Sequence, residues 1–240
     1  MLEPELKPKL ISQALLKLIG LFVFLPMEFI ASLIPLEVRG KEKIPRGGYI
    51  LCPTHRGELD PYFIRRAFGE RWGFKGRNRF LFRLEYGPWV RRLFLAYWGG
   101  WIVEMSGPSP SPSPSPNLKP IRGALAWLAL DRPVTIFPEG HEHGRGVIHQ
   151  GAAFLACRSG KPLLPVIIDR GVFVGEGTPF YLFPFHVLRA YRRLAPRVTL
   201  TFLEPLPPDP ERYREERGRY LEELTRELSR RLFGRELEVK

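Results

Sequence analysis

The sequence predicts an α/β fold with a mostly parallel central sheet flanked by helices, preceded by an N-terminal amphipathic helix pair. Two observations predict this fold. Short runs rich in β-branched residues alternate with longer helical segments, and the runs are continuously apolar, as in strands that are buried on both faces. The chain has 240 residues, 44% of them hydrophobic, which is enough for one sizeable core. We therefore expect N-terminal membrane-interface helices over 1–35 and one α/β domain over 36–240.

The N-terminal segment is apolar but interrupted. Lys17, Gly20, Pro26 and Glu28 leave no clean stretch of the roughly 20 apolar residues that a simple spanning helix needs. Leucines form a broad apolar face on the first helix, which Pro26 should end or kink. The pattern predicts a helix lying in a membrane interface and then a second short helix; the alternative is packing on the protein's own core. Residues 1–9 have balanced charges, unlike a secretory signal.

The α/β domain should contain five strands and five helices. The expected strands are 49–54, 101–105, 134–140, 163–169 and 198–203, and the expected helices are 61–69, 88–97, 118–130, 150–159 and 211–233. Four Ser-Pro repeats in 107–117 predict an extended loop, either a flap over the site or an inert surface insertion. Because ligands gather at the carboxyl ends of parallel strands, "THRGELD" and "FPEG" mark the expected site.

The formal charge of +12 favours an anionic partner: nucleic acid, an acidic membrane or a phosphorylated small molecule. Basic residues interleave with aromatic ones over 71–98, a pattern that fits a surface at acidic lipid headgroups. No recognition-helix or RNA-stacking motif accompanies the charge, so we expect no nucleic-acid partner. Cys52 and Cys157 lack metal-ligand or redox spacing, which fits a reducing, cytoplasmic compartment.

His55 and Asp60 are the first candidates for chemistry. If a strand ends at Thr54 and Pro61 opens a helix, Asp60 falls at the N-cap, a position that needs no catalysis to explain it. His55 lies in a turn at the strand end, where an aspartate five residues on can bond one ring nitrogen and leave the other to take a proton. Glu139, in the tight turn of "IFPEG", is the second candidate.

The segments "LEVRGKEKIPRGGYILCPTHRGELDP", "FPEG" and "SGKPLLPVII" occur in an order and spacing that resembles the glycerolipid acyltransferase family, which includes 1-acylglycerol-3-phosphate acyltransferases. The resemblance covers the chain from about Leu36 to Phe202. It implies that His55 is the general base on an acceptor hydroxyl and that Asp60 orients and stabilises it. The acceptor-binding stretch that it implies is Phe137, Pro138, Glu139 and Gly140.

The resemblance also implies the substrates. The donor would be a fatty acyl thioester on coenzyme A or acyl carrier protein, and the acceptor a lysophosphatidic-acid-like lysolipid, with no cofactor. The chemistry needs no metal. Together with the N-terminal segment and the positive charge, this predicts a peripheral or monotopic protein on acidic phospholipid, at the cytoplasmic face of the cell membrane.

The chain departs from the family pattern at the residues that hold a phosphate. Met105 stands where the family usually has an arginine, and "HEHGRG" replaces a Thr-Arg-Ser-like continuation after "FPEG". Arg145 and Arg83 are the nearest cationic substitutes. The alternative is a different hydroxyl acceptor, such as glycerol 3-phosphate, another lysolipid or a glycolipid.

Three readings from other classes stay open. A metal-dependent hydrolase would use a cluster of metal-competent side chains: His141, Glu142, His143 and His149. Cys52 could be an acyl-carrying nucleophile, although a strand cysteine is more often a small buried hydrophobe. A non-catalytic basic membrane adaptor would bind acidic vesicles without lipid turnover.

Overall fold

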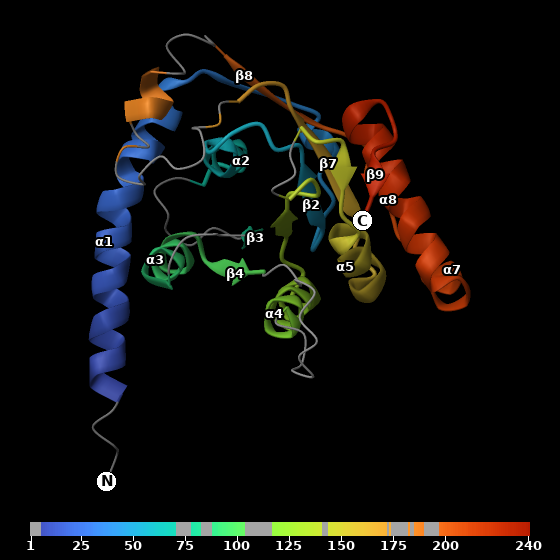
Figure 1. The fold of residues 1–240 in the computed structure, drawn as a ribbon, viewed down its shortest axis with the longest axis horizontal. Coiled ribbons are helices and arrows are strands. Elements are labelled where there is room, and N and C mark those ends of the chain that lie inside the picture. Colours follow the sequence, from blue (N-terminus) through green and yellow to red (C-terminus); the bar gives the residue numbers. More distant parts are fainter. Residues whose placement is uncertain are drawn as a thin grey trace.

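The computed structural model describes residues 6–70, 78–82, 88–103, 117–140, 144–171, 173, 182, 185–189 and 197–240. At its centre is a seven-stranded sheet with helices on both faces (Figure 1). The strands lie in the order β1 (Leu36–Arg39), β8 (Val198–Phe202), β7 (Leu163–Ile168), β2 (Ile50–Pro53), β5 (Val134–Ile136), β3 (Arg79–Phe82) and β4 (Gly100–Ile102). Neighbouring strands are parallel except β7 with β8, which confirms the mostly parallel sheet.

Two apolar cores, one on each face of the sheet, hold the layers together. One face packs α2 (Asp60–Ala67) and α3 (Pro88–Trp98), and the other packs α4 (Leu118–Ala129), α5 (Gly151–Ser159) and α8 (Arg217–Phe233). The central strand β2 serves both cores: Leu51 belongs to the first, and Ile50 and Cys52 belong to the second. Burial on both faces is why the run "YILCPT" lacks polar alternation.

The remaining small elements lie at the margins of the sheet. The 3-10 helix η1 spans Lys41–Lys43, α7 spans Pro210–Glu215, and β6 (Val147–Ile148) pairs in parallel with β9 (Glu238–Val239). The predicted helix 211–233 is divided at Glu216, whose backbone leaves helical geometry at φ −126 and ψ 47. The predicted strand 134–140 ends at Ile136, so "FPEG" lies in the turn beyond it.

The two predicted N-terminal helices are joined in one helix, α1 (Leu6–Leu33), with Pro26 inside it. Pro26 is exposed, and its ring removes one N–H donor from the helix without ending it. The C-terminal half of α1 packs on the first core through Phe24, Met27, Ile30 and Ala31, so packing on the protein's own core is confirmed for this half. Among the described residues, no helix is both long and apolar enough to span a bilayer.

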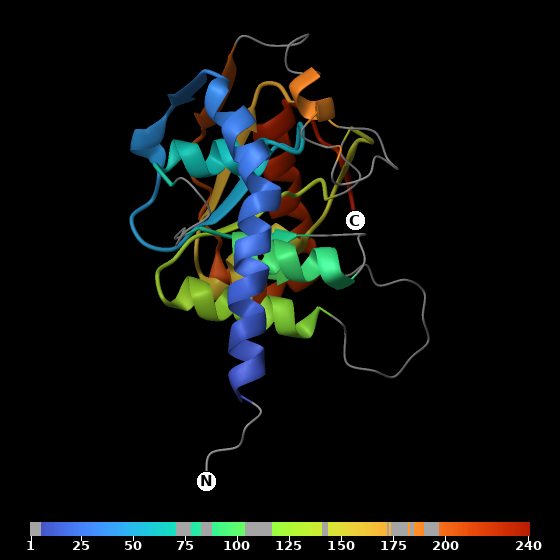
Figure 2. The ribbon, with the colours of Figure 1, turned by 90° about the vertical axis from the view of Figure 1, so that its left-hand side faces the viewer.

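Polar contacts fasten α1 to the helices beneath it (Figure 2). The Arg66 guanidinium, on α2, donates to the carbonyl oxygens of Ala31 and Ile34, the latter at 2.8 Å, and so satisfies carbonyls at the end of α1. The Tyr97 hydroxyl, on α3, donates to Glu28 Oε2 at 2.7 Å. These bonds set the position of α1 relative to α2, the helix that begins with Asp60.

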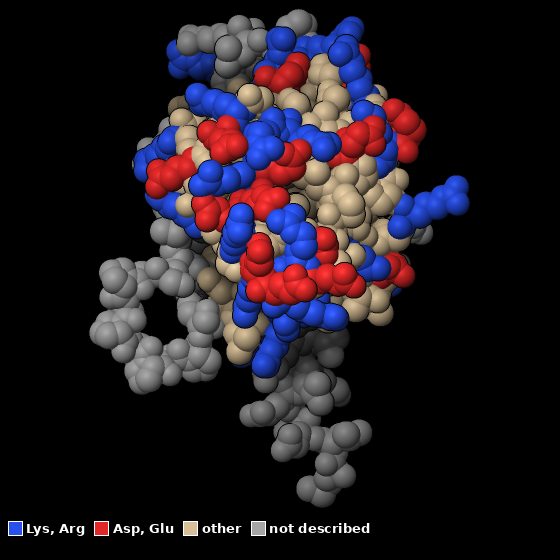
Figure 3. All heavy atoms as spheres, turned by 90° about the vertical axis from the view of Figure 1, so that its right-hand side faces the viewer, with Lys and Arg blue, Asp and Glu red and all other residues tan. Residues whose placement is uncertain are grey.

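The outer face of α7 and α8 carries interleaved acidic and basic side chains (Figure 3). Arg226 pairs with Glu222 at 2.6 Å, and Arg231 pairs with Glu227 at 2.9 Å, both at the i,i+4 spacing of neighbouring side chains on a helix surface. Residues 204–240 contain ten Asp and Glu against nine Lys and Arg. The positive excess of the chain therefore lies in residues 1–203.

Candidate active site

His55 lies just beyond the carboxyl end of β2, at the sheet edge predicted for the site. Two hydrogen bonds fix the backbone before it: Thr54 N–H donates to Val166 O at 2.9 Å, and Ile168 N–H donates to Thr54 Oγ1 at 2.9 Å. Both partners belong to β7, the parallel neighbour of β2. The loop that carries His55 thus starts from a rigid point in the middle of the sheet.

Asp60 gathers this loop around one carboxylate oxygen. Its Oδ2 lies 2.9 Å from His55 Nδ1 and accepts the backbone N–H groups of Arg56 at 2.6 Å and Gly57 at 2.8 Å. The residue has no exposed surface. Two main-chain N–H donors and the His55 ring therefore converge on Oδ2, whereas the buried Oδ1 has no hydrogen-bond partner among the described residues.

This geometry corrects the capping interpretation of Asp60. The N-cap of α2 is Leu59, and Asp60 is already the first helical residue. The carboxylate is turned back onto the loop rather than onto the first turn of the helix. Helix initiation therefore does not explain the aspartate, whereas orientation of His55 does.

The His55 ring has one orientation available for proton transfer. An anionic Asp60 makes Nδ1–H the donor of their bond, so Nε2 is the nitrogen that can take a proton. The ring packs against Phe137 at a centroid distance of 4.4 Å and against Phe173 at 5.0 Å, and 23% of the side chain is exposed. A base that is clamped on one nitrogen, walled by aromatic rings and partly open can meet a substrate hydroxyl.

Glu139 joins the second predicted stretch to the first. Its side chain is buried, with 3% of the residue exposed. Oε2 accepts the backbone N–H of His55 at 2.9 Å, and Oε1 accepts that of Gly144 at 3.4 Å. Both oxygens are thus occupied by main-chain donors, so Glu139 holds the His55 loop against the turn after β5. Its predicted contact with the acceptor stays a prediction.

The rest of the "FPEG" turn is compact. Phe137 stacks on His55, Pro138 O accepts the His149 N–H at 2.9 Å, and Gly140 has φ 58. A side chain at Gly140 would meet His149 Cδ2 at 3.2 Å, so the left-handed backbone and the crowding both require glycine. The turn therefore presents backbone and an aromatic ring to the site rather than flexible side chains.

Of the two arginines predicted to bind a phosphate, the structure describes Arg145 and not Arg83. Arg145 is exposed in the turn that follows Gly144, on the same stretch of chain that Glu139 anchors. Arg83 and Met105 lie outside the described residues, as do the Ser-Pro loop and the cluster from His141 to His143. Within the described ranges no three metal-competent side chains come together.

Cys52 does not fit the nucleophile interpretation. Its side chain is completely buried in the second core, and its thiol donates to Ile50 O at 3.6 Å. Burial raises the pKa of this thiol far above its usual range, so the sulfur stays protonated. The interpretation as a small buried hydrophobe is the one that the geometry supports.

The sequence reasoning missed the loop after β7. Gly171 approaches Arg56 so closely that a Cβ atom on it would lie 2.4 Å from Arg56 O, and Phe173 packs edge-on against the His55 ring. The parallel pairing of β2 with β7 brings these two loops together. Neighbouring parallel strands end at the same edge of a sheet, so the loop after 163–169 was a candidate for the site. Choosing it required the order of the strands, which the sequence alone does not show.

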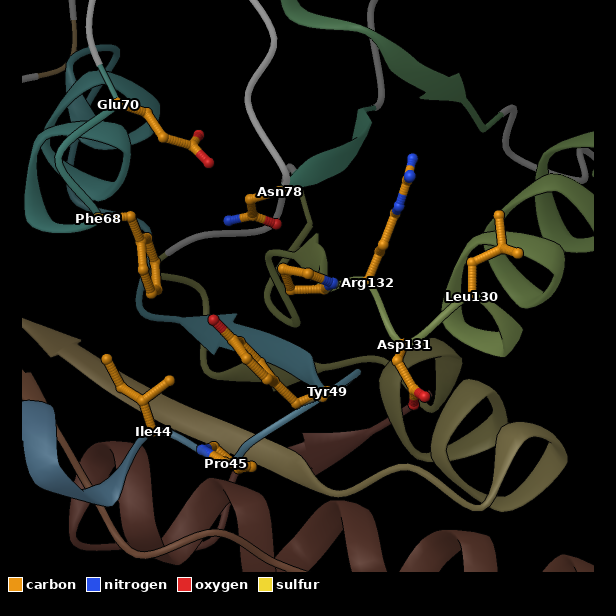
Figure 4. Close-up of a pocket in the computed structure, with 11 residues that line it drawn as sticks. Ile44, Pro45, Tyr49, Phe68, Glu70, Asn78, Leu130, Asp131 and Arg132 are labelled. Atoms are coloured by element: carbon orange, nitrogen blue, oxygen red, sulfur yellow. The ribbon is translucent and has the colours of Figure 1, made fainter.

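A pocket of about 840 Å³ lies at the opposite edge of the sheet (Figure 4). Its lining includes Tyr49, Asn78 and Pro133, which directly precede β2, β3 and β5, together with Phe68 and Arg132. His55, Asp60 and Glu139 do not line it. The hollow is therefore separate from the His55 site, and we place the chemistry at His55 because a histidine is bonded there to a buried aspartate and held by a buried glutamate.

The chain is similar to known proteins in both structure and sequence. The fold is similar to the crystal structure of the 1-acyl-sn-glycerophosphate (LPA) acyltransferase PlsC from Thermotoga maritima, with a TM-score of 0.48 and 21% sequence identity over 85% of this chain and 78% of that one. The model of the Acyltransferase family matches residues 35–169, a range that contains His55, Asp60 and Glu139. The match covers more than half of the sequence, and the chain belongs to the Acyltransferase family.

Proposed function

We propose that this protein transfers a fatty acyl chain from a thioester to the hydroxyl of a lysophosphatidic-acid-like acceptor at a membrane surface. The observation that carries the proposal is the His55–Asp60 pair, 2.9 Å apart and buried on the aspartate side, within the family region. An alcohol attacks a thioester readily once a base removes its proton, and this pair supplies that base. The donor carrier is proposed as coenzyme A or acyl carrier protein.

The proposed step begins when His55 Nε2 accepts the proton of the acceptor hydroxyl as its oxygen attacks the thioester carbonyl. The imidazolium that forms is stabilised by the Asp60 carboxylate at Nδ1. The tetrahedral intermediate then collapses, the carbon–sulfur bond breaks, and the leaving thiolate takes the proton back from His55. The products are an ester and a free thiol, and His55 returns to its starting state without a cofactor.

The proposed acceptor carries a phosphate, and Arg145 is our candidate to bind it. It is exposed, and Glu139 ties its turn to the His55 loop through Gly144. A guanidinium binds a phosphate through paired N–H donors, so Arg145 is a candidate to replace the arginine that the family usually has at the position of Met105. A different hydroxyl acceptor remains the second candidate, since Met105 stands where that arginine is expected.

The proposed setting is the cytoplasmic face of the cell membrane, with α1 as the anchor. Leu15 and Leu18 are each 53% exposed on the N-terminal half of α1, whereas the C-terminal half is tied into the body of the protein. Replacing both leucines with glutamate should release the folded protein from vesicles, because the charges oppose burial among lipid chains. Sedimentation with vesicles as before would contradict this anchor.

A product panel tests the function directly. The purified full chain would be incubated with acyl-coenzyme A or acyl-acyl carrier protein and a panel of lysolipids, glycerol 3-phosphate, glycolipids and alcohols, with products identified by mass spectrometry. We expect acylated lysophosphatidic acid from the wild type and none from His55→Ala. Acylation of unphosphorylated acceptors alone would favour the second candidate, and the absence of any acylated product would overturn the proposal.

A further inference from the structure

Arg79 and Arg132 form a cationic pair on the indole ring of Trp127. The Arg79 guanidinium carbon lies 3.7 Å from the ring centroid, and that of Arg132 lies 4.4 Å from the same centroid. The sheet register explains why the two arginines are close. Arg79 is the first residue of β3 and lies opposite Val134, and Arg132 comes two residues before Val134. Trp127 is on α4, so the pair and the ring meet where that helix ends at the amino edge of the sheet.

No described carboxylate forms an ion pair with either arginine: Glu70 and Asp131 line the same pocket as Arg132, but Asp131 pairs with Lys161 at 2.5 Å. Neither guanidinium forms a hydrogen bond or an ion pair with a described residue; their contacts are with the faces of aromatic rings. Burial lowers the pKa of Arg79, and the charge of Arg132 lowers it further, so the two cations act on each other. Like charges held together without a counter-charge favour the binding of an anion.

Two arginines of α7 and α8 provide a contrast. Arg212 pairs with Glu223 at 2.7 Å, and Arg230 pairs with Glu236 at 2.9 Å. Carboxylates therefore accompany the arginines of that face (Figure 3). Arg79 and Arg132, in contrast, have an aromatic platform that leaves their N–H donors available to an outside partner.

The surroundings of the pair suit a lipid surface. Leu130, 63% exposed, is two residues before Arg132, and Leu118 at the start of α4 is 39% exposed. Both ribbon views place α4 at the end of the body toward which the N-terminal half of α1 extends (Figures 1 and 2). Tryptophan, arginine and exposed leucine together are typical of a surface that lies at the boundary between headgroups and acyl chains.

We propose that Arg79 and Arg132, supported by Trp127, bind the phosphate of an anionic phospholipid and give the protein a second membrane contact beside α1. The proposal extends the membrane setting proposed above. Its ligand is a headgroup in a bilayer, at the opposite edge of the sheet from His55. The contact would fix the rotation of the body about α1 against the lipid surface, which one helix alone does not fix.

Vesicle binding by the full-length chain tests the proposal without relying on turnover. The double variant Arg79→Gln with Arg132→Gln would be compared with the double variant Arg214→Gln with Arg219→Gln, which removes two exposed arginines from α7 and α8. Both lose the same net charge. On phosphatidylcholine vesicles containing phosphatidylglycerol, we expect the first to bind about 10-fold or more weakly than wild type and the second less than about 3-fold more weakly.

Three further measurements test whether the lipid headgroup and the charge of the two arginines cause this difference. On pure phosphatidylcholine the two double variants should bind alike, and Arg79→Lys with Arg132→Lys should retain most of the anionic-vesicle binding if charge is what the lipid meets. Inorganic phosphate at matched ionic strength should not displace the vesicles. Four results would each overturn the proposal: equal binding by the two glutamine variants on anionic vesicles, a loss by Arg79→Gln with Arg132→Gln that is as large on neutral vesicles as on anionic ones, loss of binding in the lysine variant, or displacement by inorganic phosphate.

The assay also distinguishes failure of this proposal from failure of the proposed function. The His55→Ala variant should bind anionic vesicles as the wild type does, and the Arg79→Gln with Arg132→Gln variant should still acylate an acceptor presented in detergent. Absence of acyl transfer by the wild type would therefore leave the vesicle result interpretable on its own.

Discussion

The two edges of the sheet differ in how they treat charged and polar groups. At the carboxyl edge, Asp60 and Glu139 are buried, and Asp60 Oδ2 and Glu139 Oε2 accept backbone N–H groups of the His55 loop. At the amino edge lies a hollow of about 840 Å³, yet Arg132, which lines it, has no ion pair with a described residue and packs on the ring of Trp127. Space alone therefore does not locate chemistry in this protein. The better guide to the site is a set of side chains whose orientation is fixed by hydrogen bonds to the backbone.

The largest expected difference between the edges is in turnover. His55→Ala should lower kcat by at least about 10²-fold, because no other described group is positioned to take the hydroxyl proton. Tyr49→Phe, at the amino edge, removes a hydroxyl with no hydrogen bond to a described residue and should leave kcat unchanged. Steady-state kinetics and a thermal unfolding curve for each variant provide the check. A folded His55→Ala enzyme with near-normal kcat would break the comparison.

The next effect concerns the phosphate of the acceptor. Arg145→Ala should raise KM for a phosphorylated acceptor by about 10-fold or more, with little change for a neutral alcohol, since the guanidinium makes a charged contact worth roughly 1.5 to 3 kcal/mol. As a control, Arg132→Ala removes one positive charge at the amino edge of the sheet and should leave both KM values unchanged in detergent. A rise in KM with Arg132→Ala and none with Arg145→Ala would reverse the assignment.

A smaller effect tests whether Glu139 is a fastening between loops. Glu139→Ala should lower the free energy of unfolding by about 1 to 3 kcal/mol, because it leaves the buried N–H of His55 without an acceptor. Glu139→Gln keeps one carbonyl acceptor and should recover most of the loss. Chemical denaturation measures both. If the two variants are equally destabilised, the carboxylate charge matters more than the hydrogen bond to His55.

The smallest effect is a control on buried groups that belong to neither edge. Burial raises the pKa of Cys157, on α5, from 9.0 to about 11. The folded state therefore favours the neutral thiol, so its contribution to stability is complete below pH 9 and is lost as the pH rises through about 11. Between pH 9 and 11 the unfolding free energy of the wild type should fall more steeply than that of Cys157→Ala. Parallel curves would contradict this titration.

The sequence was most informative where one local pattern decides the structure. The apolar runs predicted the central strands correctly because strands that are buried on both faces are apolar throughout. The contact between His55 and Asp60 was predictable because five residues are few enough for one loop to bring the two side chains together. Strands β1 and β3 were missed: "LEVR" alternates charge with apolar residues at a sheet edge, and "RFLF" lies within a basic and aromatic stretch. Their identity depends on neighbours that are distant in the sequence.

The site was only partly predictable for the same reason. That Glu139 would accept the N–H of His55, 84 residues earlier in the chain, depends on the order of the strands and not on any local motif. The continuity of α1 through Pro26 depends on its packing against α2 and α3, which outweighs the local cost of proline. Tertiary contacts decided both outcomes.

The bonds from the His55 loop to Asp60 have a consequence for how this enzyme can diversify. The aspartate grips Arg56 and Gly57 through their main-chain N–H groups, so the bonds themselves make no demand on the side chain at position 56 beyond the exclusion of proline. A mutation there can change what the loop offers to a passing molecule while the base keeps its alignment. Selection for a new acceptor can therefore act on residues adjacent to His55 without disturbing the hydrogen bonds that orient the His55 ring.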